Sequence, residues 1–414
     1  MPAKEPARTL PSRSLELFFD YSCPYAYLAS HEVEAAAARM GVAVSYRPFL
    51  LGGVFQARGT PQNLMNQLSP AKAAHNLHDM HRWARRRNVP LVVPAEHPRR
   101  TVQALRATIA CKNDPKVIAG FFRAYWELGL DPSAPSTIGE IVGAAGYDAS
   151  DILARIESAE IKDALRKATD EAIARGVFGA PTFFVDGTHA YWGQDRFPFV
   201  EGAPLPRGER TDAGRGRTVE AYWDYSSPFA YLGMAHVETI AARISATVVS
   251  RPMLLGAVFK AVGQANVPLA TFSPERQAHM LLDLERWAAY LGVPYTFPSR
   301  FPMSSLRALR ATLLLPEAKR RAFRDSVFHA YWAEDRDISD EAVLGQLLGD
   351  DAALVLPRIG SPEVKAELAA ATEEAVSRGV FGAPTFVVDG ELFWGQDRLD
   401  FVEERLTRPS PDDS

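Results

Sequence analysis

The sequence predicts a tandem α/β protein in which one mixed unit of strands and helices occurs twice. The 414-residue chain is longer than one ordinary domain needs. Three motifs of the first half recur in the same order in the second half. Each half alternates strand and helix patterns in the order strand, helix, strand, helices, strand, strand, helix, which favours two domains of the same fold.

The repeat is clearest in these three motifs. DYSCPYAYLA at 20–29 returns as DYSSPFAYLG at 224–233, an offset of 204 (224 − 20). RGVFGAPTFFVDG at 175–187 returns as RGVFGAPTFVVDG at 378–390, and WGQDR at 192–196 returns at 394–398. This period is far longer than that of a solenoid repeat and indicates a duplicated domain.

Composition outside the motifs sets the expected boundaries. EGAPLPRGERTDAGRGR, at 201–217, is rich in Pro, Gly and charged residues, which is typical of a flexible linker. The two chain ends carry no strand or helix pattern and are expected to be disordered. The predicted organisation is a tail at 1–12, domain one at 13–202, a linker at 203–217, domain two at 218–407 and a tail at 408–414.

The first part of each copy is expected to be a strand, a helix and a parallel strand. SLELFFDY and TVEAYWDY alternate apolar and polar residues and are rich in aromatic residues, as strands are. Helical periodicity follows over 25–40 and 229–244. VAVSYRP and TVVSRP predict second strands that end at Pro48 and Pro252.

The second part of each copy is expected to be helical and then to return to the sheet. Ser69 and Ser273 precede prolines and are candidate N-caps of long helices. APTFFVDG and HAYWG predict a hairpin turning at Asp186-Gly187, and a last helix is expected near Asp195. This plan is typical of a thioredoxin-like fold interrupted by a helical insertion.

Charge and composition exclude several classes of protein. Hydrophobic residues make up 47% of the chain and the net charge is only −4, which favours neither a nucleic-acid surface nor an anionic membrane. No apolar run is long enough for a membrane helix, and the start lacks the apolar segment of a signal peptide. The two cysteines, Cys23 and Cys111, form no disulfide framework, so we expect reduced thiols and a cytoplasmic protein.

Cys23 and Ser227 occupy corresponding positions at a strand-to-helix turn. A helix N-terminus carries unpaired N–H groups and partial positive charge, which stabilise a thiolate. A dithiol site would need a second cysteine three residues later, but Ala26 and Ala230 stand there. Neither copy can therefore cycle a local disulfide. The alternatives are a helix cap for Ser227 and a small buried hydrophobic residue for Cys23.

Two further motifs could bind a peptide-like ligand. In thioredoxin-like folds the proline of Gly-Ala-Pro-Thr-Phe is cis, and the residue before it pairs its backbone with an extended ligand. An Asp-Arg pair in WGQDR could bind a ligand with ammonium and carboxylate groups, as in glutathione, or Asp could simply cap the last helix. The candidate residues are Ala180, Pro181, Asp195, Arg196, Ala383, Pro384, Asp397 and Arg398.

With these motifs, both copies resemble the kappa-class glutathione transferases and the related 2-hydroxychromene-2-carboxylate isomerases, in the DsbA-like branch of the thioredoxin superfamily. The resemblance implies glutathione as cofactor, with a serine at the Ser227 position donating a hydrogen bond to its sulfur and Cys23 replacing that serine in copy one. It also implies that Ala180 and Ala383 pair with the glutathione backbone. The two Asp-Arg pairs would contact the γ-glutamyl end.

The resemblance implies a reaction as well. The lysine that kappa transferases use after the second strand has no convincing counterpart, because Arg58 and Lys260 are only nearby. The isomerases are therefore the first expectation: glutathione-dependent cis-trans isomerisation of a small aromatic 2-hydroxychromene-2-carboxylate-like substrate. The alternatives are kappa-like glutathione transfer or monothiol thiol-disulfide oxidoreduction, and a non-catalytic glutathione-binding tandem module.

Three roles are open for Cys23, and two other expectations follow. Cys23 could assist glutathione in the serine's place, form a mixed disulfide with it, or be structural. HNLHDMH at 75–81 resembles a metal cluster, but only two of its candidate ligands recur in HMLLDLE, so no metal site is expected. Family members commonly dimerise, which implies that the two domains form an intramolecular pseudo-dimer.

Overall fold

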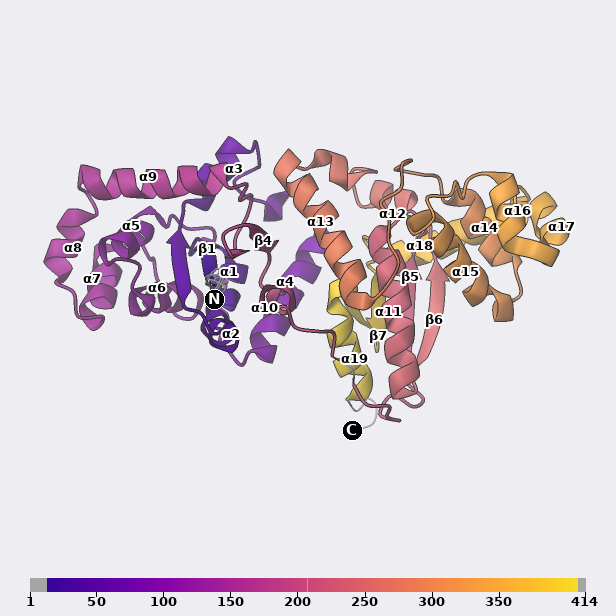
Figure 1. Cartoon of the computed structure of the whole chain (residues 1–414), viewed down its shortest axis with the longest axis horizontal. Coiled ribbons are helices and arrows are strands. Elements are labelled where there is room, and N and C mark those ends of the chain that lie inside the picture. Colours follow the sequence, from indigo (N-terminus) through magenta and orange to yellow (C-terminus); the bar gives the residue numbers. More distant parts are fainter. Residues whose placement is uncertain (1–12, 207, 409–414) are drawn as a thin grey trace, which may run out of the picture. The chain divides into compact units, whose positions relative to one another are not determined.

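The computed structural model describes residues 13–206 and 208–408, which form two compact units, one mainly of residues up to 203 and one mainly of residues from 204 onward. The tails predicted at 1–12 and after residue 408 lie outside the described residues. Each unit contains a four-stranded mixed sheet together with helices (Figure 1). The predicted α/β class and the repeated plan are confirmed.

The sheet of the first unit has the strand order β2-β1-β3-β4. β1 and β2 are parallel, whereas β3 pairs antiparallel with both β1 and β4. Leu17, at the centre of β1, lies opposite Tyr46 on β2 and Phe183 on β3. The strands are β1 (Leu15–Phe19), β2 (Val44–Pro48), β3 (Thr182–Val185) and β4 (His189–Trp192).

The sheet of the second unit repeats this topology as β6-β5-β7-β8. β5 and β6 are parallel, and β7 is antiparallel to β5 and β8. As predicted, the second strand of each copy ends at a proline, Pro48 or Pro252. The strands are β5 (Thr218–Trp223), β6 (Thr247–Pro252), β7 (Thr385–Val388) and β8 (Glu391–Trp394).

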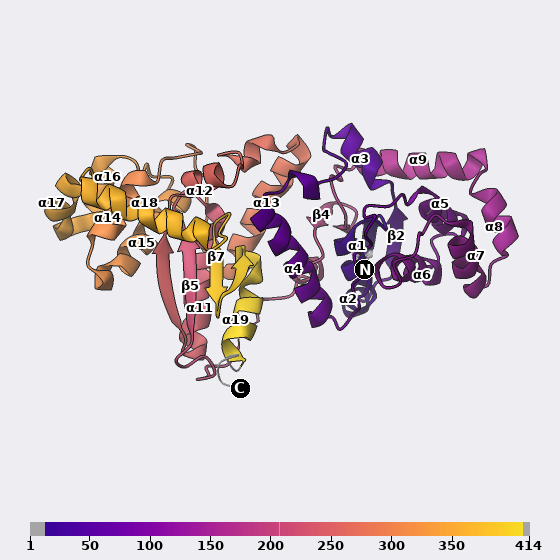
Figure 2. The same cartoon turned by 180° about the vertical axis from the view of Figure 1, so that it is seen from behind.

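Helices fill the insertion and cover the sheets. In the second unit, α11 packs on β5 and β6, and α19 packs on β5, β7 and β8 (Figures 1 and 2). In copy one they are α1 (Pro24–Ser30), α2 (Val33–Met40), α3 (Leu51–Ala57), α4 (Pro70–Arg86), α5 (Val102–Ala110), α6 (Pro115–Trp126), α7 (Pro135–Ala144), α8 (Ala149–Arg155), α9 (Ala159–Ala174) and α10 (Phe197–Glu201). In copy two they are α11 (Pro228–Ile244), α12 (Leu255–Ala261), α13 (Pro274–Leu291), α14 (Leu306–Leu314), α15 (Glu317–Trp332), α16 (Glu341–Leu348), α17 (Ala352–Val355), α18 (Pro362–Ser377) and α19 (Leu399–Thr407).

The first helix differs between the copies. The prediction of one helix over 25–40 is wrong, because α1 ends at Ser30 and α2 begins at Val33, whereas α11 runs unbroken. The Ser30 hydroxyl donates to the Tyr27 carbonyl at 2.8 Å, a side-chain bond that competes with the helical ladder. Copy two has Met234 at the corresponding position, which cannot make that bond and has a higher helix propensity.

The predicted hairpins are present in both copies. Asp186 and Gly187 have φ angles of 53° and 72°, and Asp389 and Gly390 have 48° and 76°. Two consecutive left-handed residues form the turn that matches the twist of the flanking strands, and Asp-Gly tolerates this conformation. Each hairpin brings the Gly-Ala-Pro segment and the WGQDR segment to the same end of its sheet.

Part of the predicted linker is anchored to the second unit. The Thr211 N–H bonds the Arg243 carbonyl and the Gly214 N–H bonds the Ile244 carbonyl, both at 2.8 Å. These bonds satisfy carbonyls at the end of α11, where helical partners are absent. Residues 211–217 are therefore not the free segment that their composition predicts.

Trp126 and Trp332, at the ends of α6 and α15, lie in the core. Both side chains are fully buried. The indole N–H of Trp126 donates to the Tyr21 carbonyl and that of Trp332 to the Tyr225 carbonyl, both at 2.8 Å. Each insertion helix therefore supports the turn that carries Cys23 or Ser227.

Candidate functional site

Ser227 is the N-cap of α11 and meets the Gly-Ala-Pro loop. Its Oγ accepts the Ala230 N–H at 3.1 Å and donates to the Ala383 carbonyl at 2.9 Å. Pro228 occupies the first helical position, where no N–H is needed. The hydroxyl is thus positioned at the positive end of a 17-residue helix.

Cys23 occupies the same place in copy one with different chemistry. Its Sγ donates to the Ala180 carbonyl at 3.0 Å and makes no capping bond to α1. Burial, with a smaller contribution from the Asp20 charge, raises the pKa of the Cys23 thiol to about 12, although two backbone N–H groups act to lower it. Desolvation therefore outweighs the N–H groups at the start of the seven-residue helix α1, and the surroundings of Cys23 favour the neutral thiol.

Pro181 and Pro384 both follow cis peptide bonds, as expected from the motif. The Pro181 carbonyl accepts the Gly193 N–H and the Pro384 carbonyl accepts the Gly395 N–H, both at 3.0 Å. The structure thus brings all three motifs of each copy together. One hydrogen bond joins the first helix to the cis-proline loop, and a second joins that loop to WGQDR.

The glycines before these loops have little room for a side chain. A Cβ on Gly179 would lie 2.5 Å from Nε1 of Trp192, and one on Gly382 would lie 2.5 Å from Nε1 of Trp394. The backbone of the cis-proline loop therefore lies directly against an indole ring in each copy. A larger residue at either position would displace the loop backbone.

The Asp-Arg pairs form ion pairs between neighbouring residues. Arg196 Nη1 lies 2.9 Å from Asp195 Oδ1, and Arg398 Nη1 lies 3.3 Å from Asp397 Oδ1. Neither aspartate is the N-cap of the helix that follows, because Arg196 and Arg398 hold that position. An acidic and a basic side chain therefore lie together beside each cis-proline loop.

Two buried carboxylates beside the turns were missed by the sequence reasoning. Asp20 and Asp224 are almost completely buried, and burial raises the pKa of both carboxyl groups. The Asp224 carboxylate accepts the Ser226 N–H at 2.9 Å and the Leu255 N–H at 2.7 Å. The signal was present in the repeat, because an aspartate opens both DYSCP and DYSSP at the end of a buried strand.

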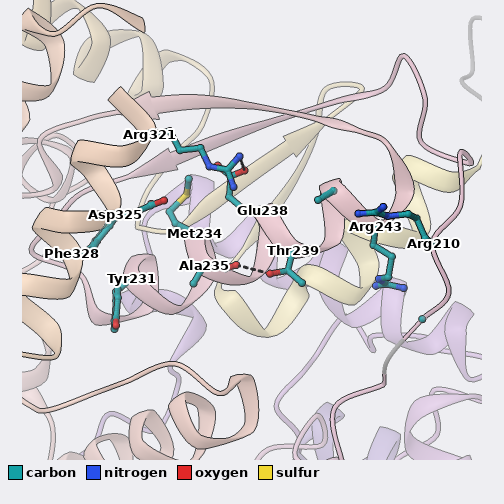
Figure 3. A pocket seen from close by; sticks show the side chains of 12 residues that line it. Arg210, Tyr231, Met234, Ala235, Glu238, Thr239, Arg243, Arg321, Asp325 and Phe328 are labelled. Carbon is teal, nitrogen blue, oxygen red and sulfur yellow. Dashed lines mark hydrogen bonds and ion pairs between the residues drawn. The ribbon is translucent and has the colours of Figure 1, made fainter. Parts of the chain in front are cut away.

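A cavity of about 740 Å³ lies along α11 in the second unit. Figure 3 shows Tyr231 and Phe328 at one end of this cavity, and Arg321 beside Glu238. Tyr231 follows Ser227 by one helical turn, but Ser227, Ala383 and Asp397 are not among the lining residues. The cavity is thus separate from the predicted glutathione contacts.

The histidine-rich segment of α4 contains a buried ion pair. Arg82 Nη1 lies 2.9 Å from Asp79 Oδ1, and both side chains are nearly inaccessible. Within residues 13–206 and 208–408, no group of three His, Cys, Asp or Glu side chains is placed to hold a metal ion. None of the helices described is both long and apolar enough to cross a membrane.

The raised pKa of Cys23 predicts slow chemistry at this thiol. At pH 7 we expect iodoacetamide to label Cys23 in the folded chain at least about a hundredfold more slowly than in the urea-unfolded chain, since little thiolate is present. We also expect no glutathione adduct after incubation with oxidised glutathione, as judged by intact mass. Rapid formation of an adduct at Cys23 would contradict both the pKa and the geometry.

Comparison with known proteins agrees with this geometry. A model of the DSBA-like thioredoxin domain matches residues 14–203 and again residues 218–407. The chain belongs to the DsbA-like thioredoxin domain family. This membership confirms the fold that the three motifs predicted.

Individual relatives of this DsbA-like chain align with about one copy each. A 2-hydroxychromene-2-carboxylate isomerase of Sphingobium xenophagum is 33% identical over 193 residues, which cover 46% of this chain and 98% of the isomerase. Another, of Pseudomonas putida, is 28% identical and covers 46% and 94%. Human glutathione S-transferase kappa 1 is 29% identical over 209 residues and covers 46% and 91%. The predicted resemblance to these two groups is thereby confirmed.

Proposed function

We propose that the protein is a glutathione-dependent cis-trans isomerase acting on a 2-hydroxychromene-2-carboxylate-like aromatic substrate, and that copy two carries the turnover. The observation that supports this most is the placement of Ser227, whose hydroxyl lies 2.9 Å from the carbonyl before the cis-proline. The similarity to isomerases over nearly their whole length supports the reaction class.

The residues of copy two fit glutathione. Ala383 offers backbone groups at a cis-proline loop, and Asp397 and Arg398 supply charges that match an ammonium and a carboxylate. Ser227 supplies a hydroxyl donor at a helix N-terminus. When bound, glutathione supplies a thiolate nucleophile for reversible addition to a conjugated substrate.

Ser227 acts by donating a hydrogen bond, not as the nucleophile. Its Oγ lone pair is held by the Ala230 N–H, so the hydroxyl hydrogen remains the group that can be redirected. On ligand binding the hydroxyl turns this hydrogen from the Ala383 carbonyl to the sulfur. The freed carbonyl then accepts a backbone N–H of the bound tripeptide. A charge-assisted donor of this kind favours thiolate over thiol.

Copy one is less suited to this task. The Cys23 thiol is a poorer hydrogen-bond donor than a hydroxyl, and Cys23 precedes a helix of seven residues, whereas Ser227 precedes one of seventeen. We therefore assign copy one a binding or structural role. Kappa-like transfer is the second candidate, supported by the similarity to glutathione S-transferase kappa 1.

The purified full chain tests the proposal directly. With reduced glutathione, it should convert 2-hydroxychromene-2-carboxylate to the trans-o-hydroxybenzylidenepyruvate, as followed by absorbance, and without glutathione it should not. Consumption of glutathione with an electrophilic aryl halide, but no isomerisation, would instead favour the transferase. Binding of glutathione with neither reaction would leave a non-catalytic module.

Gly382 provides a structural test of the ligand-binding loop. Gly382→Ala should weaken glutathione binding by about tenfold or more, since a Cβ would lie 2.5 Å from the Trp394 ring nitrogen and would displace the loop backbone. Calorimetric titration measures this. Gly345→Ala is the control, because a Cβ there meets only an ordinary contact with Leu356. Equal affinity of the Gly382 variant and the parent would refute the placement of the ligand.

A further inference from the structure

Asp20 and Asp224 are ionisable groups that the proposed chemistry does not use. Each stands at the end of the first strand of its copy, three residues before Cys23 or Ser227. Both side chains are essentially inaccessible, at 1% and 0% exposure. An unpaired buried charge is costly, so the donors around each carboxylate indicate what the group holds together.

In copy one, the Asp20 carboxylate joins three separate segments. It accepts the Ser22 N–H at 3.0 Å within the turn that leads to Cys23. It accepts the Leu51 N–H at 2.8 Å, at the start of α3. It also accepts the Thr101 hydroxyl at 2.7 Å, at the N-cap of α5. The backbone carbonyl of Asp20 in addition accepts the Cys23 N–H at 3.1 Å.

Copy two repeats the arrangement with different side chains around it. The Asp224 carboxylate accepts the Ser226 and Leu255 N–H groups, as Asp20 accepts those of Ser22 and Leu51. Ser305 stands at the position of Thr101 and lowers the pKa of the Asp224 carboxyl. The same pair of backbone bonds therefore lies beside a thiol in one copy and a hydroxyl in the other. These carboxylate bonds therefore do not depend on whether cysteine or serine stands three residues after the aspartate.

We propose that Asp20 and Asp224 are positioning residues, whose buried carboxylates hold the Cys23 and Ser227 turns against the carbonyl that precedes each cis-proline. The bonds to Leu51 and Leu255 join each turn to the helix after the second strand, and in copy one the Thr101 hydroxyl also joins it to the helical insertion. A shift of the helical insertion in copy one would therefore displace the turn that carries Cys23, because the Asp20 carboxylate is bonded to both. For copy two this deepens the proposed function and rests on it, whereas for copy one it does not.

Cys23 makes the proposal measurable without any assumption about the reaction. In the full chain, Asp20→Asn replaces one acceptor oxygen by an NH₂ group that faces donors, and removes a negative charge near the sulfur. We expect iodoacetamide at pH 8 to label Cys23 about tenfold faster in this variant than in the parent. Site-resolved mass spectrometry gives the rate at Cys111 in the same sample, and this rate should change less than about twofold.

Two outcomes would overturn the proposal. One is an increase of less than about threefold in the labelling rate of Cys23. The other is an equal increase in the labelling rate of Cys111, which would indicate general loosening of the fold. Asp163→Asn, at an exposed position, controls for the loss of a charge. If Asp20→Asn does not fold, Thr101→Val and Thr101→Ser replace it. Thr101→Val should raise the rate of iodoacetamide labelling at Cys23 but not at Cys111. Thr101→Ser, which introduces the residue of copy two, should leave both rates unchanged. Equal labelling rates at Cys23 in the two variants would overturn the proposal.

A variant of copy two distinguishes a failure of the positioning role from a failure of the proposed function. Asp224→Asn should raise the glutathione KM at least about tenfold and lower kcat less, because the turn is displaced but the hydroxyl remains. An unchanged KM would overturn the assignment of Asp224. If the parent shows no turnover, the proposed function fails, whereas the labelling of Cys23 still decides the role of Asp20.

Discussion

Ser227→Ala is expected to lower kcat/KM for glutathione-dependent isomerisation by about 10- to 100-fold. A hydrogen bond to a charged group contributes about 1.5–3 kcal/mol, and each 1.4 kcal/mol is a factor of ten. Alanine keeps the cis-proline loop and the Asp-Arg pair but removes the donor at Oγ. Steady-state kinetics of the full chain, with glutathione varied at fixed substrate, measures the loss.

Matched variants separate the donor from the helix cap. Alanine also removes the acceptor of the Ala230 N–H, which costs about 1 kcal/mol of stability. Ser227→Cys recreates copy one and should give an intermediate rate, while Cys23→Ser should strengthen glutathione binding in copy one. Ser326→Ala, on the exposed face of α15, is the neutral control. If Ser227→Ala kept the parental kcat/KM while folded, Ser227 would have no part in the reaction.

Trp332→Ala is expected to lower the free energy of unfolding by about 3–5 kcal/mol. The side chain is fully buried, and truncating a buried tryptophan loses its transfer free energy and leaves a cavity. It also strands the Tyr225 carbonyl, which accepts the indole N–H at 2.8 Å. Urea denaturation of the full chain, followed by circular dichroism, measures the shift in the transition of the second unit.

The tryptophan has a matched partner and a conservative variant. Trp332→Phe keeps most of the ring volume and should cost about 1–3 kcal/mol, chiefly through the unpaired carbonyl. Trp126→Ala should shift the transition of the first unit by an amount similar to Trp332→Ala. A loss below about 1 kcal/mol for Trp332→Ala would mean that the surrounding helices close the cavity completely.

Strands, hairpins and most helices were predictable because they depend on local patterns. The parallel strands ending at Pro48 and Pro252 and the Asp-Gly turns follow from periodicity and turn chemistry. Duplication strengthened each prediction, since a pattern that occurs twice is less easily accidental. The break after Ser30 was missed because the apolar periodicity continues through 25–40, although a single hydroxyl satisfies the Tyr27 carbonyl there.

The members of the candidate site were also predictable, but their chemistry was not. The three motifs named Cys23, Ala180 and Asp195 as candidates, and the structure brings the segments that carry them together. The pKa of Cys23 depends on desolvation, and the sequence motifs do not show how deeply the thiol is buried. The role of Asp195 depends on where the following helix begins, and that start differs from the expected one by two residues.

The sequence by itself determined that this is a duplicated α/β protein with glutathione-transferase-like and isomerase-like motifs, and that neither copy has a dithiol pair. These properties reside in residue identity, spacing and periodicity. Only the tertiary structure decided that burial raises the pKa of the Cys23 thiol, that Asp20 joins three segments, and that Asp224 joins its turn to the start of α12. Burial and hydrogen bonds between residues far apart in the chain arise only when the sheet and the insertion pack together, and those two effects set the chemistry of the turn.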